Sequence, residues 1–200
     1  MADMVLNIAI RFWLPNESAV RVPFLVPAIE GILLLVLVAH PARHNPRRPW
    51  VRPVAVTLVL VLVLAALWET TVLVADLIRG RGVTNEPSEL LALGAVVWLG
   101  NNLAFGLLYW LMDGAGPAAR LHQQAPVDLA FTQQLDLELK PGWRPVFLDY
   151  LHLGFTNATA FSPTDVMPLT LRAKYTMLVQ ATVALALFGL IVARAVNAFT

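Results

Sequence analysis

The chain has 200 residues, of which 58% are hydrophobic and only 14% are charged. Soluble domains carry about 25% charged residues, so this composition predicts a protein that lives in a lipid bilayer. Without cysteine, the chain can form no disulfide, thiolate nucleophile or cysteine-bound metal site. A formal net charge of +1 provides no field to attract nucleic acid, so we expect no nucleic-acid partner.

Four stretches are apolar enough to cross a bilayer as helices, which takes about 20 residues each. They run from about 23 to 40, 53 to 78, 88 to 112 and 171 to 199. The first two begin at prolines, where the missing N–H does least harm. Residues 1–14 are apolar and predict a short helix that lies along the membrane surface and ends near Pro15.

The connections between these stretches differ in length. Residues 40–52 form a short basic loop and residues 79–87 a mixed turn, whereas residues 113–170 are too many for a simple loop. We therefore divide the chain into an N-terminal part, residues 1–80, and a second part, residues 81–200. The long connection is polar from 114 to 142 and predicts a water-exposed segment there.

An apolar run of about a dozen residues follows Pro145 and is too short to span the membrane. Pro145 suits a first helical turn, and Asp149 lies near the positive end of the helix dipole. Pro163 and Pro168 prevent the helix from continuing. The pattern predicts a helix over 145–158 that enters the membrane without crossing it. Irregular backbone after it is tolerated only inside protein or beside a water-filled cavity.

The string TAFSPTD at 159–165, followed by VM and PLT, resembles the pore module of potassium-channel-like proteins. There the filter T-T-V-G-Y-G-D is followed, after two residues, by P-x-T. The resemblance implies an outer helix at 88–112, a pore helix at 145–158, an inner helix at 171–199 and a homotetramer. It also implies a pore lining of Thr159, Ala160, Phe161, Ser162, Pro163, Thr164 and Asp165.

The same string also resembles that of an uncharacterised group of bacterial four-helix membrane proteins, which implies the bacterial inner membrane. Ser162 and Thr164 replace the two filter glycines of the channel pattern, so potassium selectivity is not expected. A ring of hydroxyls with Asp165 would favour monovalent or divalent cations weakly. The alternative is a loop that packs against the helices and conducts nothing, with Asp165 paired to Arg172 or Lys174.

Polar residues within the apolar stretches suggest a second candidate site. An ionisable side chain in lipid is costly, so it is a functional candidate by default. The predicted network is either a proton or ion relay or a means of packing the helices together. Its members are Glu30, Glu69, Asn101, Asn102 and Gln180.

The orientation in the membrane stays open at this point. If residues 40–52 are cytoplasmic, nine basic residues lie on the cytoplasmic side and five outside, which agrees with the positive-inside rule. The same arrangement puts the segment 145–170 on the cytoplasmic side, whereas the channel resemblance implies the outer side.

The sequence thus predicts an all-α integral membrane protein with four transmembrane helices, an interfacial N-terminal helix and a re-entrant helix and loop between helices three and four. We expect a cation channel without potassium selectivity, or a degenerate channel. The alternative is a non-conducting scaffold or lipid-binding protein, and a transporter ranks third because no internal repeat is found. The sequence contains no paired acids and bases, no nucleophile elbow and no histidine pairing. We therefore expect no enzymatic activity, no metal site and no cofactor.

Overall fold

The computed structural model of the chain describes residues 51–79, 87–121, 125–135, 142–160 and 165–199. Three helices in this part are long and apolar enough to cross a membrane: Pro53–Arg79, Leu91–Ala115 and Leu171–Ala193. The described part is therefore mostly helical as predicted, and its three long apolar helices support an integral membrane protein. The predicted surface helix at 1–14 and the predicted first transmembrane helix at 23–40 lie outside the described residues.

The long helices agree closely with the predicted ranges. Helix α3 covers Val51–Arg79, α4 covers Pro87–Met112 and α8 covers Leu171–Phe199. Helix α7, Phe147–Ala160, has 14 residues and begins two residues later than predicted. Short helices lie between α4 and α7: η2 at Asp113–Ala115, α5 at Pro117–Leu121 and α6 at Thr132–Leu135.

The expectation of an all-α chain is wrong in one detail, because the structure contains a small antiparallel sheet. Strand β1, Leu129–Phe131, pairs with β2, Val166–Pro168, so that Ala130 faces Met167. All three residues of β1 are buried. The segment 114–142 is therefore not uniformly water-exposed as predicted. Its middle folds back into the protein because an apolar triplet, Leu129 to Phe131, follows Asp128.

The chain forms two compact units that divide α4 and α8 between them. Unit 1 comprises residues 1–101 and 183–200, and unit 2 comprises residues 102–182. The core of unit 1 is built from aliphatic residues of α3, α4 and α8, namely Leu73, Leu77, Leu93, Val97, Leu187 and Ile191. A Cβ at Gly94 would collide with the Ile191 side chain, so glycine permits the close approach of α4 to α8 there.

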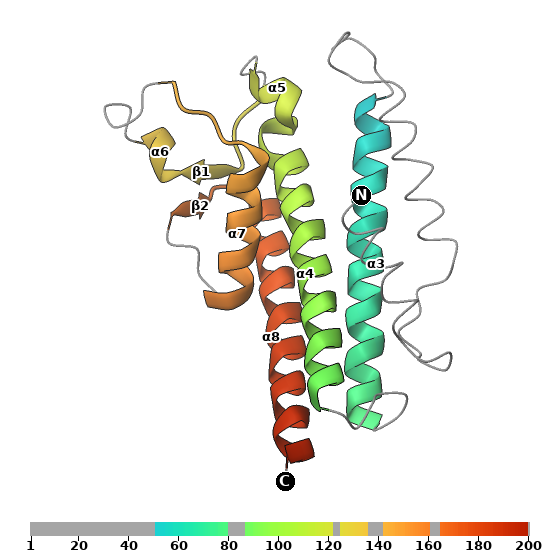
Figure 1. Cartoon of the computed structure of the whole chain (residues 1–200). Helices are drawn as coiled ribbons and strands as arrows, with labels where there is room; N and C mark the ends of the chain where they lie inside the picture. Colours follow the sequence, from blue (N-terminus) through green and yellow to red (C-terminus); the bar gives the residue numbers. More distant parts are fainter. Residues whose placement is uncertain (1–50, 80–86, 122–124, 136–141, 161–164, 200) are drawn as a thin grey trace. The chain divides into compact units, whose positions relative to one another are not determined.

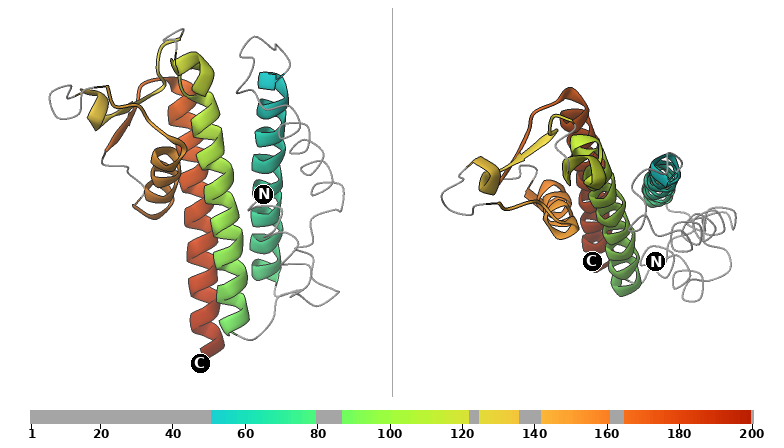
Figure 2. Two further views of the ribbon diagram at one scale, coloured as in Figure 1. Left: turned by 45° about the horizontal axis from the view of Figure 1, so that its top comes forward. Right: turned by 90° about the horizontal axis from the view of Figure 1, so that it is seen from above.

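In unit 2, helix α7 lies beside the C-terminal part of α4 and the N-terminal part of α8 (Figures 1 and 2). Two glycines face this contact. A Cβ at Gly106 would lie 3.3 Å from Leu151 Cα, and one at Gly154 would lie 3.4 Å from the Asn102 carbonyl oxygen. The absence of side chains at both positions lets α7 pack closely against α4.

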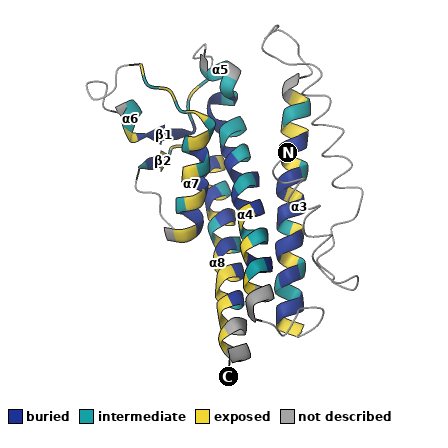
Figure 3. Ribbon diagram, viewed as in Figure 1, coloured by how far each residue is buried: buried dark blue, intermediate teal, exposed yellow. Residues whose placement is uncertain are grey.

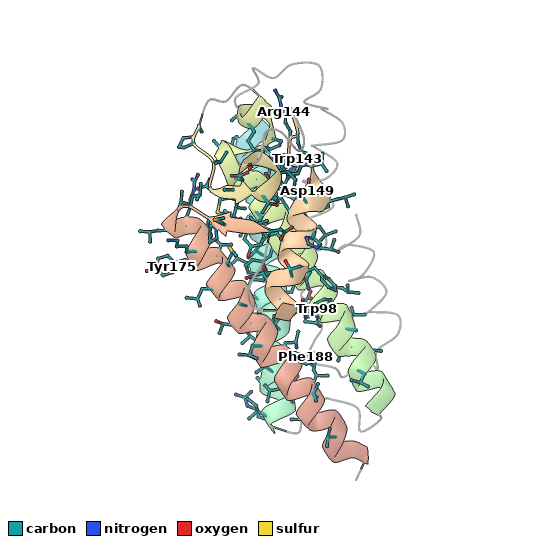
Figure 4. All side chains as sticks on the ribbon, turned by 90° about the vertical axis from the view of Figure 1, so that its left-hand side faces the viewer. Trp98, Trp143, Arg144, Asp149, Tyr175 and Phe188 are labelled. Carbon is teal, nitrogen blue, oxygen red and sulfur yellow. The ribbon has the colours of Figure 1, made fainter. Side chains whose placement is uncertain are left out.

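Both α7 and α8 expose apolar side chains (Figure 3). On α8, Leu178 and Phe188 are more than 60% exposed, and Tyr175 projects away from the helix (Figure 4). On α7, Leu148 and Phe155 are also exposed. Exposed apolar surface on membrane-spanning helices is what a lipid environment requires, and it agrees with the membrane assignment.

Candidate functional site

Helix α7 begins with a hydrogen-bonded cap. The Asp149 carboxylate accepts a hydrogen bond from the Val146 backbone N–H, with Oδ2 2.7 Å from the nitrogen. This is the reciprocal half of a capping box and also puts negative charge at the positive end of the helix dipole. Pro145 was predicted in the first turn but precedes the cap residue Val146. Trp143, Arg144 and Asp149 lie together at this end of unit 2 (Figure 4).

A buried carboxylate, Asp113, ties the start of α7 to the end of α4. Its Oδ2 accepts a 2.6 Å hydrogen bond from the Tyr150 hydroxyl, and its Oδ1 accepts from the backbone N–H groups of Asp128 and Leu129. Burial, followed by the Asp113 carboxylate, raises the pKa of Tyr150, so the phenol stays a donor. Arg120 lies 5.0 Å above the Tyr150 ring and donates to the carbonyl oxygens of Trp110 and Asp113.

The turn that follows α4 depends on glycine. Gly114 has a φ of +54°, and a Cβ there would lie 2.7 Å from Arg120 Cγ. Its N–H donates to Asp128 Oδ2 at 3.2 Å. The left-handed turn thus brings the end of α4 to a second buried carboxylate, Asp128.

Asp128 binds the start of α8. Arg172 donates to its two oxygens from Nε and Nη2, each at 2.5 Å, and the Thr170 hydroxyl donates to Oδ1 at 2.6 Å. Burial acts to raise the pKa of Asp128, but the hydrogen bonds from Arg172 and Thr170 outweigh it and hold the pKa below its ordinary value. The alternative prediction that Arg172 pairs with Asp165 is wrong, because Arg172 forms its salt bridge with Asp128.

Asp113 and Asp128 together place the two ends of the α7 segment at the same end of unit 2. Tyr150 holds its entry on Asp113, while the Leu169 N–H donates to the Asp128 carbonyl oxygen at 2.8 Å and holds its exit. The β1–β2 pairing lies between them. Helix α7 therefore leads away from this end of unit 2, and strand β2 is at this end again.

In the second half of α7, amide side chains join three helices. Asn157 Nδ2 donates to Gln180 Oε1 and to the Met177 carbonyl oxygen, both at 2.9 Å. The Tyr109 hydroxyl also donates to Gln180 Oε1, at 2.8 Å. Gln180 Nε2 in turn donates to the Gly154 carbonyl oxygen at 3.0 Å and more weakly to Asn102 Oδ1 at 3.4 Å. The predicted grouping of Asn102 with Gln180 is thus present, and it fastens α7 to α4 and α8.

The predicted pore lining is described only at its two ends. Thr159 lies in the last turn of α7, is exposed and donates its hydroxyl proton to the Phe155 carbonyl oxygen. Asp165 Oδ2 lies 3.5 Å from His152 Nδ1, and the Asp165 side chain is 33% exposed. Ala160 ends α7, and residues 161–164, which include Phe161, Ser162, Pro163 and Thr164, lie outside the described residues.

Unit 2 therefore combines a returning segment, an anchoring pair of carboxylates and an acidic side chain beyond the end of the short helix. No protein-family model, curated protein or solved structure matches the chain. What unit 2 can do chemically is set by its own groups: the Thr159 hydroxyl in the last turn of α7 and the Asp165 carboxylate beside His152 offer oxygen atoms of the kind that bind cations.

The other predicted polar residues belong to unit 1 or lie outside the described residues. Glu69 and Asn101 are both buried in unit 1, and Asn101 Nδ2 lies 3.4 Å from Thr70 Oγ1. Glu30 is not described. The predicted network is therefore divided, because Asn102 and Gln180 belong to unit 2.

Sequence reasoning missed Asp113, Asp128, Tyr150 and Asp76, all of which are buried. The string Asp-Gly-Ala-Gly at 113–116 carried a usable signal, since a carboxylate before two glycines at the end of an apolar helix indicates a tight polar turn. The pairing of Asp128 with Arg172 spans 44 residues and had no local signal.

Proposed function

We propose that unit 2 is a membrane-re-entrant, pore-type module of a homo-oligomer, with four copies favoured, that conducts cations without selecting potassium. The observation that carries the proposal is the return of the α7 segment to the end at which it enters. A helix of 14 residues is about 21 Å long and cannot cross roughly 30 Å of hydrocarbon. One such segment cannot surround an axis, so a pore needs several copies.

Two negatively polarised groups of the segment suit a cation. The C-terminal end of α7 carries the negative pole of the helix dipole, and Thr159 lies in that last turn. Asp165 lies beside His152, about two helical turns before Thr159, and contributes a carboxylate that remains partly exposed. In a symmetric oligomer these groups would repeat around one axis and concentrate cations there.

Potassium selectivity is not part of this proposal. A potassium filter presents a queue of backbone carbonyls, and glycines let the backbone turn so that they face the axis. The chain has Ser162 and Thr164 at the two glycine positions and Pro163 between them. Permeating sodium and potassium should therefore meet similar barriers.

A second function, a non-conducting membrane scaffold or lipid-binding protein, is favoured by a different observation. Two polar side chains of α7 form hydrogen bonds within unit 2. Tyr150 donates to Asp113, and Asn157 donates to Gln180 and to the Met177 carbonyl oxygen. Such a helix would also serve as a packing element. The two functions differ in whether ions cross the membrane.

Flux measurements on the purified full chain in lipid vesicles decide between them. We expect cation flux that is similar for sodium and potassium and absent from vesicles that carry no protein. A strong preference for potassium would contradict the assignment of the filter. A protein that is intact and oligomeric in the vesicles but passes neither ion would support the scaffold function instead.

A further inference from the structure

A histidine and a carboxylate lie side by side on the exposed face of α7. The nitrogen His152 Nδ1 is 3.5 Å from Asp165 Oδ2, and the two side chains are 60% and 33% exposed. Leu148 and Phe155, one turn before and one turn after His152 on the same face of the helix, are exposed as well. The pair is therefore open to a ligand from outside unit 2.

The distance within this pair is long for a hydrogen bond between charged groups. Such bonds have a nitrogen–oxygen distance of about 2.7–2.9 Å. Two ligands of one tetrahedral metal ion, each about 2.0–2.1 Å from it, lie instead about 3.3 Å apart. The 3.5 Å between His152 Nδ1 and Asp165 Oδ2 is close to the separation of two metal ligands.

The Asp165 carboxylate also has acceptor capacity left. Its Oδ1 is buried and receives no hydrogen bond from any described residue, and its Oδ2 has the long contact with His152. In Asp113 and Asp128, by contrast, each oxygen accepts a hydrogen bond of 3.2 Å or less. A cation at Oδ2 would provide stabilisation that hydrogen bonds from the described residues do not give Asp165.

Both side chains project from backbone that other contacts hold in place. His152 lies between Tyr150 and Asn157, whose hydrogen bonds fasten α7 within unit 2. The Asp165 carbonyl oxygen accepts a hydrogen bond from the Thr132 N–H at 3.1 Å, next to the paired strands β1 and β2. Ligands that are positioned in advance lose little freedom on binding, which favours affinity.

We propose that His152 and Asp165 bind a divalent transition-metal ion of the zinc class. Imidazole nitrogen suits zinc, copper and nickel, whereas calcium and magnesium prefer oxygen ligands. Among the described residues, no group of three or more histidine and acidic side chains could bind a metal. Water therefore fills the remaining positions of the ion, as it does in open zinc sites.

The bound ion would close a loop that contains the predicted pore lining. His152 and Asp165 are 13 residues apart, and residues 159–164 lie between them in the chain. A metal bridge across such a loop stabilises the folded chain. The sequence did not predict the site, because metal motifs within one helix or loop place their ligands about three to five residues apart.

Cobalt and zinc binding to the purified full chain tests the assignment. Metal-free protein in detergent would be titrated with Co²⁺, whose visible absorption reports nitrogen and oxygen ligands, and the Co²⁺ would then be displaced by Zn²⁺. We expect His152→Ala and Asp165→Asn each to raise the dissociation constant of one equivalent of Co²⁺ about tenfold or more. The double variant should lose no more than either single variant, because both ligands hold the same ion.

A second measurement uses thermal unfolding. An ion that binds the folded chain stabilises it, so Zn²⁺ should raise the unfolding temperature of the parent chain more than that of His152→Ala. His40, His44 and His122 are present in both proteins, so the difference between them reports the proposed site. The His152 side chain is 60% exposed, so its replacement should leave the fold intact, which circular dichroism would check.

Asp149→Asn is the matched control, because it removes a carboxylate one turn before His152 that caps α7. Its Co²⁺ binding should equal that of the parent chain. An equal loss in this variant would show that acidic residues attract the ion without a site. Unchanged binding in His152→Ala, or displacement of Co²⁺ by excess Ca²⁺, would show that imidazole is not a ligand. Each of these results would overturn the proposal.

The proposed ion is bound and does not permeate, so the metal site and the proposed function can fail separately. A chain that binds Co²⁺ through His152 but passes no sodium or potassium keeps the metal site and excludes conduction. A chain that conducts but binds Co²⁺ equally well without His152 excludes the metal site alone.

Discussion

The Asp128 side chain connects separate parts of unit 2, since its carboxylate accepts hydrogen bonds from Gly114, Thr170 and Arg172. Replacement by Asn removes the charge and one of the two acceptor oxygens. We expect Asp128→Asn to lower the free energy of unfolding by about 2–4 kcal/mol, less than a fully buried pair because the Arg172 side chain is 59% exposed. Denaturant unfolding in detergent micelles would measure the loss.

Asp149→Asn is the matched control, because it makes the same change in a carboxylate that only caps α7. The asparagine amide oxygen can still accept from the Val146 N–H, so Asp149→Asn should lower the free energy of unfolding only by the lost interaction with the helix dipole, about 0.3–1 kcal/mol. Equal losses from the two variants would show that the Arg172 contact contributes nothing beyond a single hydrogen bond.

The pH dependence of stability should also carry the signature of Asp128. Its pKa in the folded chain lies below the ordinary value of 3.8, so the folded carboxylate holds its proton less tightly than the unfolded one. The stabilisation is therefore complete above that ordinary value and is lost as the pH falls through the folded pKa. The gap in stability between the parent chain and Asp128→Asn should narrow on acidification from pH 7 to below 3.8.

Gly114 and Gly142 form a natural pair for testing the turn after α4. Both have positive φ, +54° and +73°, but only Gly114 has a side chain, that of Arg120, against its missing Cβ. Gly142→Ala should cost about 1–2 kcal/mol from backbone strain alone, and Gly114→Ala about 2–4 kcal/mol because Arg120 must also move. Equal unfolding free energies for the two variants would mean that the Arg120 side chain moves aside without lowering the stability of the fold.

At the scale of elements, helix length and polar chemistry were predictable to different degrees. The bounds of α8 were predicted to the residue because apolar composition continues from Leu171 to Phe199. Helix α7 began later than predicted because the Val146 N–H donates to the Asp149 carboxylate, which makes Val146 the cap residue, whereas Pro145 has no N–H to donate. Strands β1 and β2 were missed because three residues are too few to show alternation, and their pairing joins Leu129 to Pro168 across the whole segment.

The candidate site was predictable in its residue types and less so in its contacts. Asn102 and Gln180 were recognised because amides stand out in apolar helices, and they do meet. Asp76 was passed over because it lies one turn from the end of α3, where an acidic residue ordinarily reaches solvent. Its burial depends on packing within unit 1, which residue order along α3 does not encode.

The α7 segment as a whole should open onto one side of the membrane only. The chain has no cysteine, so single cysteines can be placed at Arg144 and Leu169, both exposed and on either side of the segment. We expect both to react with a membrane-impermeant thiol reagent from the same side, because Asp113 and Asp128 hold the two ends together.

Arg79→Cys provides the reference for the opposite side of the membrane. Along the chain, one predicted membrane-spanning helix, α4, separates Arg79 from the α7 segment. It should react only from the other face of the vesicle. If Leu169→Cys is labelled from the same side as Arg79→Cys, and from the opposite side to Arg144→Cys, the segment crosses the membrane and the pore-type module is excluded.

At the scale of the whole assembly, Asp165 distinguishes a conducting module from a packing element. Its carboxylate lies 3.5 Å from His152 and is one-third exposed, so it is neither fully buried nor fully solvated. If several copies present it around one axis, it concentrates cations, and Asp165→Asn should reduce cation flux severalfold while the oligomer stays intact. Flux in vesicles and mass in detergent, compared with multiples of the 21.9 kDa chain, would be measured on the same preparation.

The control for this variant comes from the first turn of α7. Asp149→Asn removes the same charge outside the predicted pore lining, so it should leave flux close to that of the parent chain. A purely structural Asp165 would behave differently. Losing its contact with His152 would weaken the oligomer or the fold, and any flux per intact oligomer would stay the same. Unchanged flux together with a destabilised oligomer would therefore assign Asp165 to packing, because a cation that passes Asp165 must respond to the loss of its charge.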